Sequence, residues 1–311
     1  MPDPPAKPND TPTVGIGMPV FNGEQFIEEA IGSLLAQTFQ DFELVIVDNH
    51  SSDGTFEICQ RFASRDPRVR YIRQRQNYGV NHNFNSAFRL TSGKYFKWAA
   101  YDDVCAPEFL TRCVEVLDSD PSVVLAYSEM PWIDETGSHL ERRPRHFDPA
   151  ALQMTASSDA AERFTATMHN FWYTEHLDGL IRSSALAKTR LYRNHFMADH
   201  VLLSELCLYG RFLPIPEPLL FLRRHSEQSS KAPSARERLA LVHPESTHPI
   251  LTNLAQYPNR LYFHVSAIRR ASLSRSTRIR CYLAVLRTIM RWARIRIFGA
   301  QTPFGLTSLR G

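Results

Sequence analysis

The sequence lacks the signatures of several common functional classes. The patterns G-x-x-x-x-G-K-[ST], H-E-x-x-H and G-x-S-x-G are absent, which excludes a P-loop, a zinc-protease helix and a hydrolase nucleophile elbow. The five cysteines are scattered along 311 residues and form no C-x-x-C pair. This pattern argues against a zinc ribbon or a disulfide framework and fits a reducing cytosol.

Long apolar runs are also missing. No uncharged apolar stretch reaches the roughly 20 residues that a membrane-spanning helix needs. The proline-rich start, MPDPPAKPNDTP, predicts a disordered leader over residues 1–12 rather than a signal peptide or an anchor. We therefore expect a cytoplasmic protein, whose only membrane contact would be peripheral, at the inner face.

Acidic residues are absent after Glu245, where the chain has eleven arginines and no lysine. The formal net charge of the whole chain is +4, so residues 1–245 carry −7 and the basic character belongs to the tail. A basic tail on an acidic body is not the signature of a nucleic-acid-binding protein, and we expect no nucleic-acid partner.

The tail has the pattern of a basic amphipathic helix over residues 276–298. Arginines recur on one face and apolar residues on the other side, at Arg280, Arg287, Arg291 and Arg294 and at Leu283, Leu286, Met290 and Ile297. Such a helix suits an anionic membrane surface. It equally suits a helix whose apolar side packs on the protein core. Both interpretations stay open.

The first 130 residues alternate between strand-like and helix-like patterns. Strands are predicted at 13–20, 42–47, 69–73, 94–100 and 122–129, and helices at 24–37, 55–63, 80–91 and from about Pro107. This alternation is typical of βαβ units that build a parallel sheet.

Polar, aromatic or proline residues lie at the carboxyl ends of three of these strands. They are Pro19, Phe21, Asn22 and Glu24 at the end of the first strand, Asp48 and Asn49 at the end of the second, and Asp102 and Asp103 after the fourth. Open parallel α/β sheets bind ligands at the carboxyl ends of their strands. We therefore expect these residues to meet at one edge of the sheet.

The residues at this edge favour a cation over a glycine cradle. In GIGMPV the two glycines lie inside a predicted strand, and Val20 replaces the third glycine of the dinucleotide fingerprint. A phosphate-bearing ligand then needs another positive charge. A hard divalent cation held by the adjacent carboxylates Asp102 and Asp103 would supply it.

The order of the motifs resembles a known family. The segments PVFNGEQFIEEAIGSLLAQTFQDFELVIVDNHSSDGT, NYG (77–79), Asn85 and YDDVCAPEFL are similar to those of family 2 glycosyltransferases with the GT-A fold. The resemblance is close over residues 13–130 and looser to about residue 230. It implies inverting transfer of a sugar from a nucleotide diphosphate donor, with Mg²⁺ or Mn²⁺ as cofactor.

The resemblance also implies roles for single residues. Asp48 would accept a hydrogen bond from the base, and Asp102 would bind the metal and the nucleotide, with Asp103 as a supporting metal-site carboxylate. The other nucleotide-binding positions that it implies are Pro19, Phe21, Asn22, Glu24 and Asn77. Two residues depart from the family pattern, because Ala100 replaces the first carboxylate of the metal motif and Phe84 replaces an arginine that often precedes Asn85. Both departures leave the donor sugar open.

The second half resembles the acceptor side of the same family. In DGLIRSSALAKTRLYRNHFMADHVLLSELCLYG (178–210), Asp199 matches the acidic residue that opens a helix and serves as general base, with Glu205 and Asp178 in reserve. An inverting displacement needs one such base within reach of the acceptor hydroxyl. In PEPLLFLRRHSEQSS (216–230), Arg223 and His225 match the closing R-x-H segment and become candidates for diphosphate contacts.

Simpler interpretations exist for the same residues. Asp102 and Asp103 would serve equally as caps of the helix after Pro107, Asp48 as a turn residue, and Asp199 as the N-cap of a helix at 200–210. Two rival functions also use such residues: a sugar-phosphate nucleotidyltransferase and a non-catalytic module that binds nucleotide sugars.

The prediction as a whole is an α/β protein of GT-A fold. It has a Rossmann-like, mostly parallel sheet flanked by helices, and a helical C-terminal tail. Residues 13–130 would bind the nucleotide-sugar donor, 131–245 a glycan or lipid-linked acceptor, and 246–311 would form the basic tail.

Overall fold

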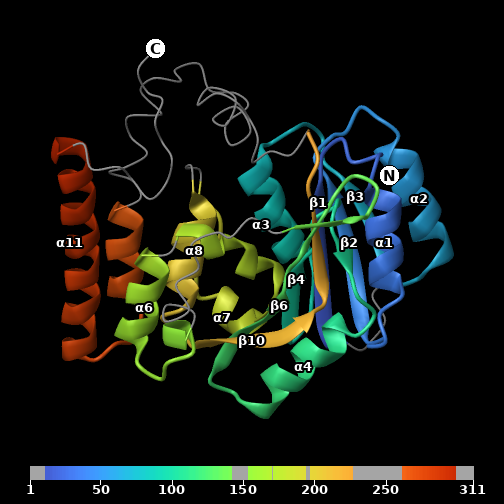
Figure 1. The fold of residues 1–311 in the computed structure, drawn as a ribbon. Coiled ribbons are helices and arrows are strands. Elements are labelled where there is room, and N and C mark those ends of the chain that lie inside the picture. The colour runs from blue at the N-terminus through green and yellow to red at the C-terminus, as the bar shows by residue number, and fades with distance from the viewer. Residues whose placement is uncertain (1–10, 142–152, 170, 194–196, 227–260, 299–311) are drawn as a thin grey trace.

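A computed structural model describes residues 11–141, 153–169, 171–193, 197–226 and 261–298. Its centre is a seven-stranded sheet in the order β10-β6-β9-β4-β1-β2-β3 (Figure 1). The strands are β1 (Val14–Val20), β2 (Phe42–Asp48), β3 (Val69–Arg73), β4 (Tyr95–Trp98), β6 (Val123–Glu129), β9 (Leu180–Arg182) and β10 (Arg211–Pro218). Strand β9 is antiparallel to both of its neighbours, and the other paired strands are parallel.

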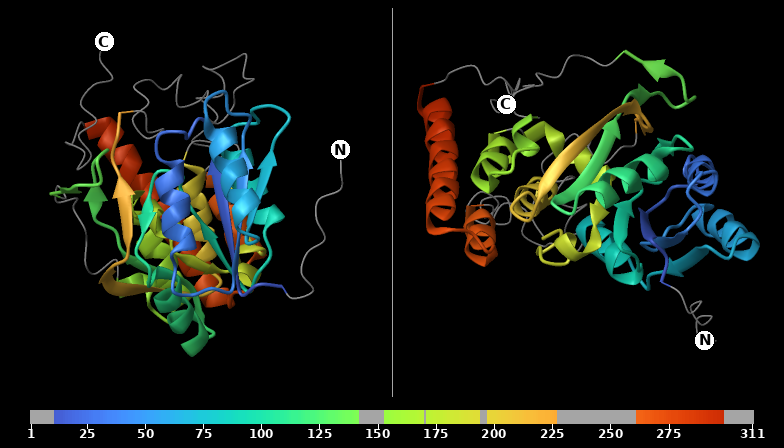
Figure 2. Two further views of the ribbon diagram at one scale, coloured as in Figure 1. Left: turned by 90° about the vertical axis from the view of Figure 1, so that its right-hand side faces the viewer. Right: turned by 90° about the horizontal axis from the view of Figure 1, so that it is seen from below.

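Helices cover both faces of this sheet. The helices that the structure describes are α1 (Ile27–Leu35), α2 (Thr55–Arg65), α3 (Val80–Leu90), α4 (Phe109–Ser119), α6 (Ala160–His169), the 3-10 helix η1 (Phe171–Asp178), α7 (Ser183–Leu186), α8 (Ala198–Leu206) and α11 (Arg275–Phe298), of which α11 packs on α6 rather than on the sheet. Residues 261–270 are also helical. Helices α1 and α2 lie on one side of the sheet and α3 on the other (Figures 1 and 2).

The predicted α/β architecture is confirmed, and each strand and helix predicted in the first 130 residues is present within a few residues of its expected position. The division near residue 130 is less sharp than the sequence suggested. Strands β9 and β10, from the second half, complete the same sheet, and β9 lies between β4 and β6. The leader prediction falls mostly on residues 1–10, outside the described residues.

The two glycines of GIGMPV have a packing role. They lie within β1, where every residue is buried. A Cβ on Gly17 would lie 2.9 Å from the backbone and Cβ of Ala87, so helix α3 sits directly on β1 at this point. The missing side chain permits close helix–sheet contact rather than the approach of a dinucleotide.

Three buried asparagines connect α3 to both halves of the chain. The Nδ2 of Asn83 donates hydrogen bonds to the carbonyls of Val20 (3.2 Å) and Val47 (3.0 Å), at the carboxyl ends of β1 and β2. Asn85 exchanges hydrogen bonds with the backbone of Tyr192, at 2.7 and 2.9 Å. Asn81 donates to the carbonyl of Arg193 (2.8 Å). One helix therefore fixes both the edge of the sheet and the segment that leads toward α8.

A second, four-stranded sheet places residues 220–223 beside the segment that follows β4. Its order is β5-β11-β7-β8, with β5 (Val104–Cys105), β7 (Trp132–Ile133), β8 (His139–Leu140) and β11 (Leu220–Arg223). Strand β11 is antiparallel to β5, with Leu220 opposite Cys105 and Phe221 opposite Val104. The chain after β11 consequently runs past Asp103 and Asp102.

The predicted tail helix is present as α11. Sequence analysis left two interpretations of its apolar residues open, and the structure does not pack Leu283, Leu286 and Met290 on the core, because they are between 43% and 49% exposed. The side chains of Arg291, Arg294 and Ile297 lie outside the described part of the chain. None of the helices described here is long and apolar enough to cross a membrane.

The asparagine bridges give a stability prediction. Replacing Asn85 by Ala should lower the free energy of unfolding by about 2–3 kcal/mol, because two buried hydrogen bonds are lost and a backbone donor and acceptor stay unpaired. Guanidinium denaturation would measure this difference. The Ser86→Ala variant, on the same helix, should change stability by less than about 0.5 kcal/mol. Equal unfolding midpoints for the two variants would contradict the bridging role.

Candidate functional site

Two loops at the carboxyl edge of the sheet are joined by reciprocal hydrogen bonds. Asn22 has a left-handed backbone (φ 51°), its N–H donates to the Ser51 hydroxyl (2.9 Å), and its Oδ1 accepts from the N–H of Ser52 (2.9 Å). The carboxylate of Glu24 accepts from the N–H of Gly54 (2.6 Å). Both predicted nucleotide-binding side chains are therefore engaged with the 51–54 loop. Phe21, in contrast, is 41% exposed at this edge.

Asp48 ends β2 as a fully buried carboxylate. Its Oδ1 accepts from the N–H and the hydroxyl of Ser51, at 2.8 and 2.6 Å, and its Oδ2 accepts from the Tyr71 hydroxyl (2.5 Å). Burial, followed by this hydrogen bond, raises the pKa of Tyr71 well above its ordinary value. The turn role of Asp48 is thus present, and its oxygens face protein donors. Pro19 is likewise buried within β1.

Asn77 contributes through the loop that it shapes. Its Oδ1 accepts from the Nδ2 of Asn49 (2.7 Å) and from the N–H of Gly79 (2.8 Å). The Oδ1 of Asn49 accepts in turn from the N–H of Tyr78 (2.9 Å). These bonds hold the ring of Tyr78, 40% exposed, beside the ends of β2 and β3. Its ring lies 4.8 Å from that of His82.

Asp102 and His225 come together from residues 123 positions apart in the chain. The Oδ2 of Asp102 lies 3.0 Å from the Nε2 of His225. The imidazole is 4% exposed and packs on the ring of Phe26, 4.8 Å away between centroids. Its Nδ1 is buried and has no hydrogen-bond partner in the described part of the chain. A carboxylate and an imidazole therefore converge at the edge of the sheet.

Arg223 was expected at the diphosphate, but its guanidinium is enclosed by protein. It is 1% exposed and donates to the carbonyls of Asp102 (2.8 Å), Asp134 (3.0 Å) and Glu135 (3.2 Å). It also forms a 2.6 Å ion pair with the carboxylate of Glu29. These contacts fix the Asp102 loop, so we interpret Arg223 as a positioning residue.

Asp103 has other partners than Asp102 has. Its Oδ1 accepts from the backbone N–H of Arg223 (2.9 Å). It lines a small internal cavity together with Lys97, Asp178, Ala100 and other residues. Burial, and then the charges of Asp102 and Asp178, raise the pKa of Asp103 well above its ordinary value. Asp103 is thus engaged with the backbone of β11 and with the cavity, which leaves Asp102 as the carboxylate placed for a cation at the edge.

A buried lysine and Ala100 also line this cavity. Lys97 is 1% exposed, and its Nζ donates to the backbone carbonyl of Asp178. Burial raises the pKa of the Asp178 carboxyl to about 7, against the lowering effect of the Lys97 charge. Asp178 thus supplies a carboxyl to the cavity that Ala100 lines, and Ala100 stands where the family pattern has a carboxylate.

Asp199 lies in the first turn of α8 and is not the N-cap residue, a position that Met197 occupies with a left-handed backbone (φ 61°). Burial raises the pKa of the Tyr192 hydroxyl, and the negative charges of Asp199 and Asp178 raise it further. The charges of both carboxyls therefore affect the pKa of the same hydroxyl. Glu205 is 2% exposed, and its carboxylate forms an ion pair with Arg270 instead.

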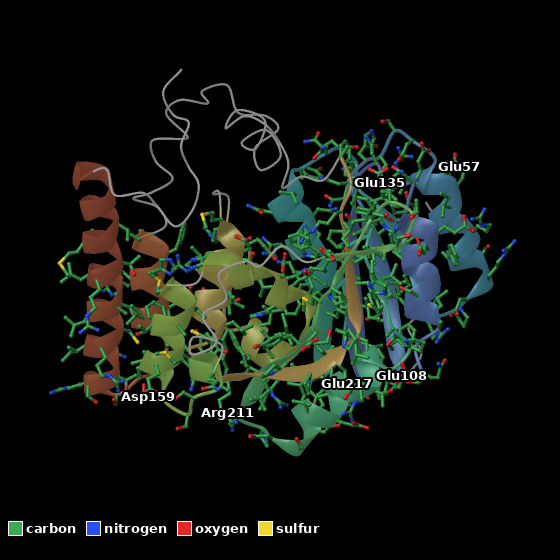
Figure 3. All side chains as sticks on the ribbon, in the orientation of Figure 1. Glu57, Glu108, Glu135, Asp159, Arg211 and Glu217 are labelled. Atoms are coloured by element: carbon green, nitrogen blue, oxygen red, sulfur yellow. The ribbon has the colours of Figure 1, made fainter. Side chains whose placement is uncertain are left out.

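The capping interpretation of Asp102 and Asp103 is not supported. The first turn of α4 is instead bonded by Gln37, in the segment after α1, whose Oε1 accepts from the N–H of Leu110 at 2.9 Å. Glu57, in the first turn of α2, marks the carboxyl edge of the sheet in Figure 3, and Glu108, before α4, lies at the opposite end. Neither carboxylate caps α4, because Asp102 contacts His225 at the edge of the sheet and Asp103 accepts from the backbone N–H of Arg223.

The side-chain ligand atoms at this edge fit a hard divalent cation that a phosphate binds as well. Among the described residues no group of three or more acidic, histidine or cysteine side chains is arranged to hold a metal. Asp102 and His225 supply one oxygen and one nitrogen, and the buried Nδ1 of His225 leaves Nε2 as its available ligand atom. Mg²⁺ and its analogues commonly bind through one or two side chains plus substrate phosphates and water.

Sequence reasoning missed three residues of this edge: Phe26, Tyr78 and Lys97. Exposed aromatic character in NYG would have indicated Tyr78. The contacts of Phe26 with His225 and with Arg223, whose Cζ lies 4.9 Å from its ring centre, have no local signal because they depend on β11.

The chain is similar to known glycosyltransferases in sequence and fold. The family model described as glycosyl transferase family 2 matches residues 16–193. An uncharacterised glycosyltransferase of Haemophilus influenzae is 22% identical over 84% of this chain and 79% of its own length. Chondroitin synthase of Escherichia coli is 34% identical over 41% of this chain, which spans only 18% of that protein.

Solved structures share the fold. TarS 1–349 of S. aureus, in complex with UDP-GlcNAc, has a TM-score of 0.65 and 17% identity, over 93% of this chain and 76% of that chain. The mannosyltransferase PcManGT of Pyrobaculum calidifontis, in complex with GDP-Man and Mn²⁺, has a TM-score of 0.54 and 17% identity, over 95% of this chain and 82% of that chain.

The raised pKa of Asp178 predicts a pH-dependent stability difference. Between about pH 4 and pH 7 the native state keeps a proton that the unfolded state has released, so the stability of the wild type falls as pH rises. The Asp178→Asn variant lacks this loss. Its gain in unfolding free energy over the wild type should be larger at pH 8 than at pH 5, by the order of 2 kcal/mol.

The control for this experiment is Asp118→Asn. Lys94 and Tyr95 hold the pKa of Asp118 below its ordinary value, so that group stays ionised from pH 5 to pH 8. Its effect on unfolding, followed by urea denaturation, should be the same at both pH values. A pH-independent effect of Asp178→Asn would contradict the raised pKa.

Proposed function

Because the chain belongs to glycosyl transferase family 2, we propose that this glycosyltransferase moves a sugar from a nucleoside diphosphate donor, with inversion, to a hydroxyl of a glycan or lipid-linked acceptor. The observation that carries the proposal is the approach of Asp102 to His225 at the carboxyl edge of the sheet. Family membership favours sugar transfer over the rival nucleotidyltransferase.

The donor lies along the ends of β1 to β4 in this proposal. Phe21 and Tyr78, two exposed rings of this edge, contact the nucleoside in this proposal, because aromatic faces stack well on bases. Asn22, Glu24, Asp48 and Asn77 support the site mainly by holding its loops, as their hydrogen bonds indicate. The donors named for TarS and PcManGT, UDP-GlcNAc and GDP-Man, are the first candidates to test.

Asp102 and His225 would hold the divalent cation, with Mn²⁺ the ion named for PcManGT. When bound there, the cation would neutralise the charge of the departing nucleoside diphosphate. Asp103 and Arg223 orient Asp102 through the β5–β11 pairing and the guanidinium contacts. Asp103 is thus a supporting residue in the proposal rather than a second ligand.

Asp199 removes the proton from the acceptor hydroxyl in this proposal. It lies in the first turn of α8, beside Tyr192, which Asn85 ties to α3. A general base must lie within hydrogen-bond reach of the proton that it takes, and an inverting reaction needs it on the face opposite the leaving group. Asp178 remains the reserve, whereas the ion pair with Arg270 argues against Glu205.

The proposal also includes a cytoplasmic location with peripheral contact at the inner face of the membrane. All five cysteines are free and buried, as suits a reducing compartment.

The metal role of Asp102 predicts a loss of metal-dependent binding. Asp102→Ala should weaken the Mn²⁺-dependent affinity for UDP or GDP about a hundredfold or more, since even indirect disturbance of a metal site costs about 10- to 100-fold. Titration calorimetry with and without Mn²⁺ would measure it. Asp103→Asn, the matched control, should retain most of the metal dependence. Unchanged Mn²⁺-dependent affinity in Asp102→Ala would sink this assignment.

The base role of Asp199 predicts a kinetic effect without a binding effect. Asp199→Asn keeps the size of the side chain and should lower turnover by about 10² to 10⁴, the usual contribution of a general base. Donor affinity should change little. Release of nucleoside diphosphate would be followed on a donor and acceptor identified by screening. Glu205→Gln should chiefly lower stability, and near-normal turnover in Asp199→Asn would transfer the role to Asp178.

A further inference from the structure

Helix α11 packs on the protein through one narrow face of small side chains. Cys281, Ala284, Val285 and Thr288 are all buried, at 4% exposure or less. Their spacing places them on a single side of the helix, and α6 packs against α11. The helix is therefore docked without the use of its larger apolar residues.

Those larger residues form a stripe on the opposite side. Ile279, Leu283, Leu286 and Met290 are 58%, 43%, 49% and 47% exposed. Their spacing of four, three and four residues aligns them along the helix, and we call this set the outer stripe. Helix α11 stands at the end of the molecule remote from α2, and no other described helix or strand covers its outer side (Figures 1 and 2). Four large apolar side chains in a row on an outer helix are an interaction surface rather than scattered exposure.

Arginines border the outer stripe. Arg275 and Arg287 are exposed on its two flanks, and neither forms an ion pair with any residue that the structure describes. Arg280, farther round the helix, forms a 2.5 Å ion pair with Asp159, labelled beside the lower end of α11 in Figure 3. No acidic residue occurs in α11 or anywhere after Glu245. The surface is thus apolar along its centre and cationic along its borders.

We propose that the outer stripe, with Arg275 and Arg287, docks α11 flat on an anionic lipid bilayer. The apolar side chains enter the acyl boundary and the guanidinium groups contact lipid phosphates, as in interfacial amphipathic helices. Charge complementarity selects this occupant. A second copy of the chain, paired stripe to stripe about a twofold axis, would bring two arginine-bordered surfaces together and face like-charge repulsion.

The proposal is independent of the proposed sugar transfer. None of its residues lies at the carboxyl edge of the sheet, so donor binding is expected to be unaffected by its loss. Membrane binding and nucleotide binding therefore fail or succeed separately.

The test is co-sedimentation of the full chain with vesicles. Vesicles of phosphatidylcholine with phosphatidylglycerol should bind the protein, and binding should weaken between 50 mM and about 500 mM salt because exposed charges are screened. Vesicles of phosphatidylcholine alone should bind it much less. Arg275→Gln with Arg287→Gln should weaken binding by about 10- to 30-fold, since each basic residue near such a surface contributes about a factor of five.

The apolar half of the surface has its own variant. Leu283→Gln with Leu286→Gln should weaken binding by about tenfold or more, and should leave the thermal unfolding midpoint and nucleotide affinity unchanged because both side chains are exposed. Matched controls remove exposed leucines elsewhere, Leu90→Gln with Leu140→Gln, and arginines of α2, Arg61→Gln with Arg65→Gln. Both controls should bind like the wild type.

Three outcomes would overturn the proposal. They are no enrichment of the wild type on anionic vesicles, equal loss of binding in the controls, and binding that persists in both α11 variants. Light scattering provides the remaining alternative. A dimer that dissociates in Leu283→Gln with Leu286→Gln, in a protein that does not bind vesicles, would identify a second copy of this chain as the occupant.

Discussion

Asp102 and Asp103 are neighbouring acidic residues, and the edge of the sheet is arranged so that only Asp102 contacts His225 there. The backbone N–H of Arg223 and the enclosed cavity draw Asp103 inward. Burial, and then the charges of Asp102 and Asp178, raise its pKa, which favours its neutral form and so eases the repulsion between the pair. Asp102 stays beside His225 at the edge. Without this separation, two adjacent carboxylates would repel each other and would also repel a diphosphate.

The arrangement around this pair links the two sheets to each other. The seven-stranded sheet supplies the segment after β4, and the four-stranded sheet supplies β11 and His225. Helix α3 makes a comparable link on the other side, where its asparagines bind the carbonyls of Val20 and Val47 and the backbone of Tyr192. The donor edge and the residues near Asp199 are thus positioned by buried polar contacts, which are sensitive to geometry because each unpaired group is costly.

Much of the fold could be predicted from the sequence because its signals are local. Apolar runs such as FELVIV and the helix period of residues 27–35 carry their own structure, and the turn chemistry of NHSSDGT joins them. The convergence of residues after β1, β2 and β4 also followed, since parallel strands end at one edge. What the sequence could not provide is the direction of side chains whose partners are distant. Arg223 and His225 match one short motif, yet one is enclosed by carbonyls and the other faces Asp102.

The tail illustrates the same limit in another form. Periodicity correctly predicted a helix at these residues, but two apolar sides were available to pack on the protein. The side with Ala284 and Cys281 is buried because small side chains allow the closer approach to α6, and the leucine side faces solvent. Amphipathicity alone treats the larger side as the core side. Shape complementarity with the neighbouring helix decides otherwise.

The long-range contacts of Arg223 and His225 limit when a growing chain can assemble the candidate site. Its partners Asp102 and Glu29 precede it by 121 and 194 residues, and His225 reaches Asp102 across 123 residues. A chain emerging from the ribosome can form β1 to β4 early, because those contacts are closer in sequence. The carboxylate–imidazole pair cannot form until β11 has been synthesised and has joined β5. Binding of a metal-linked nucleotide would therefore be withheld from the nascent chain until the acceptor side had also been made.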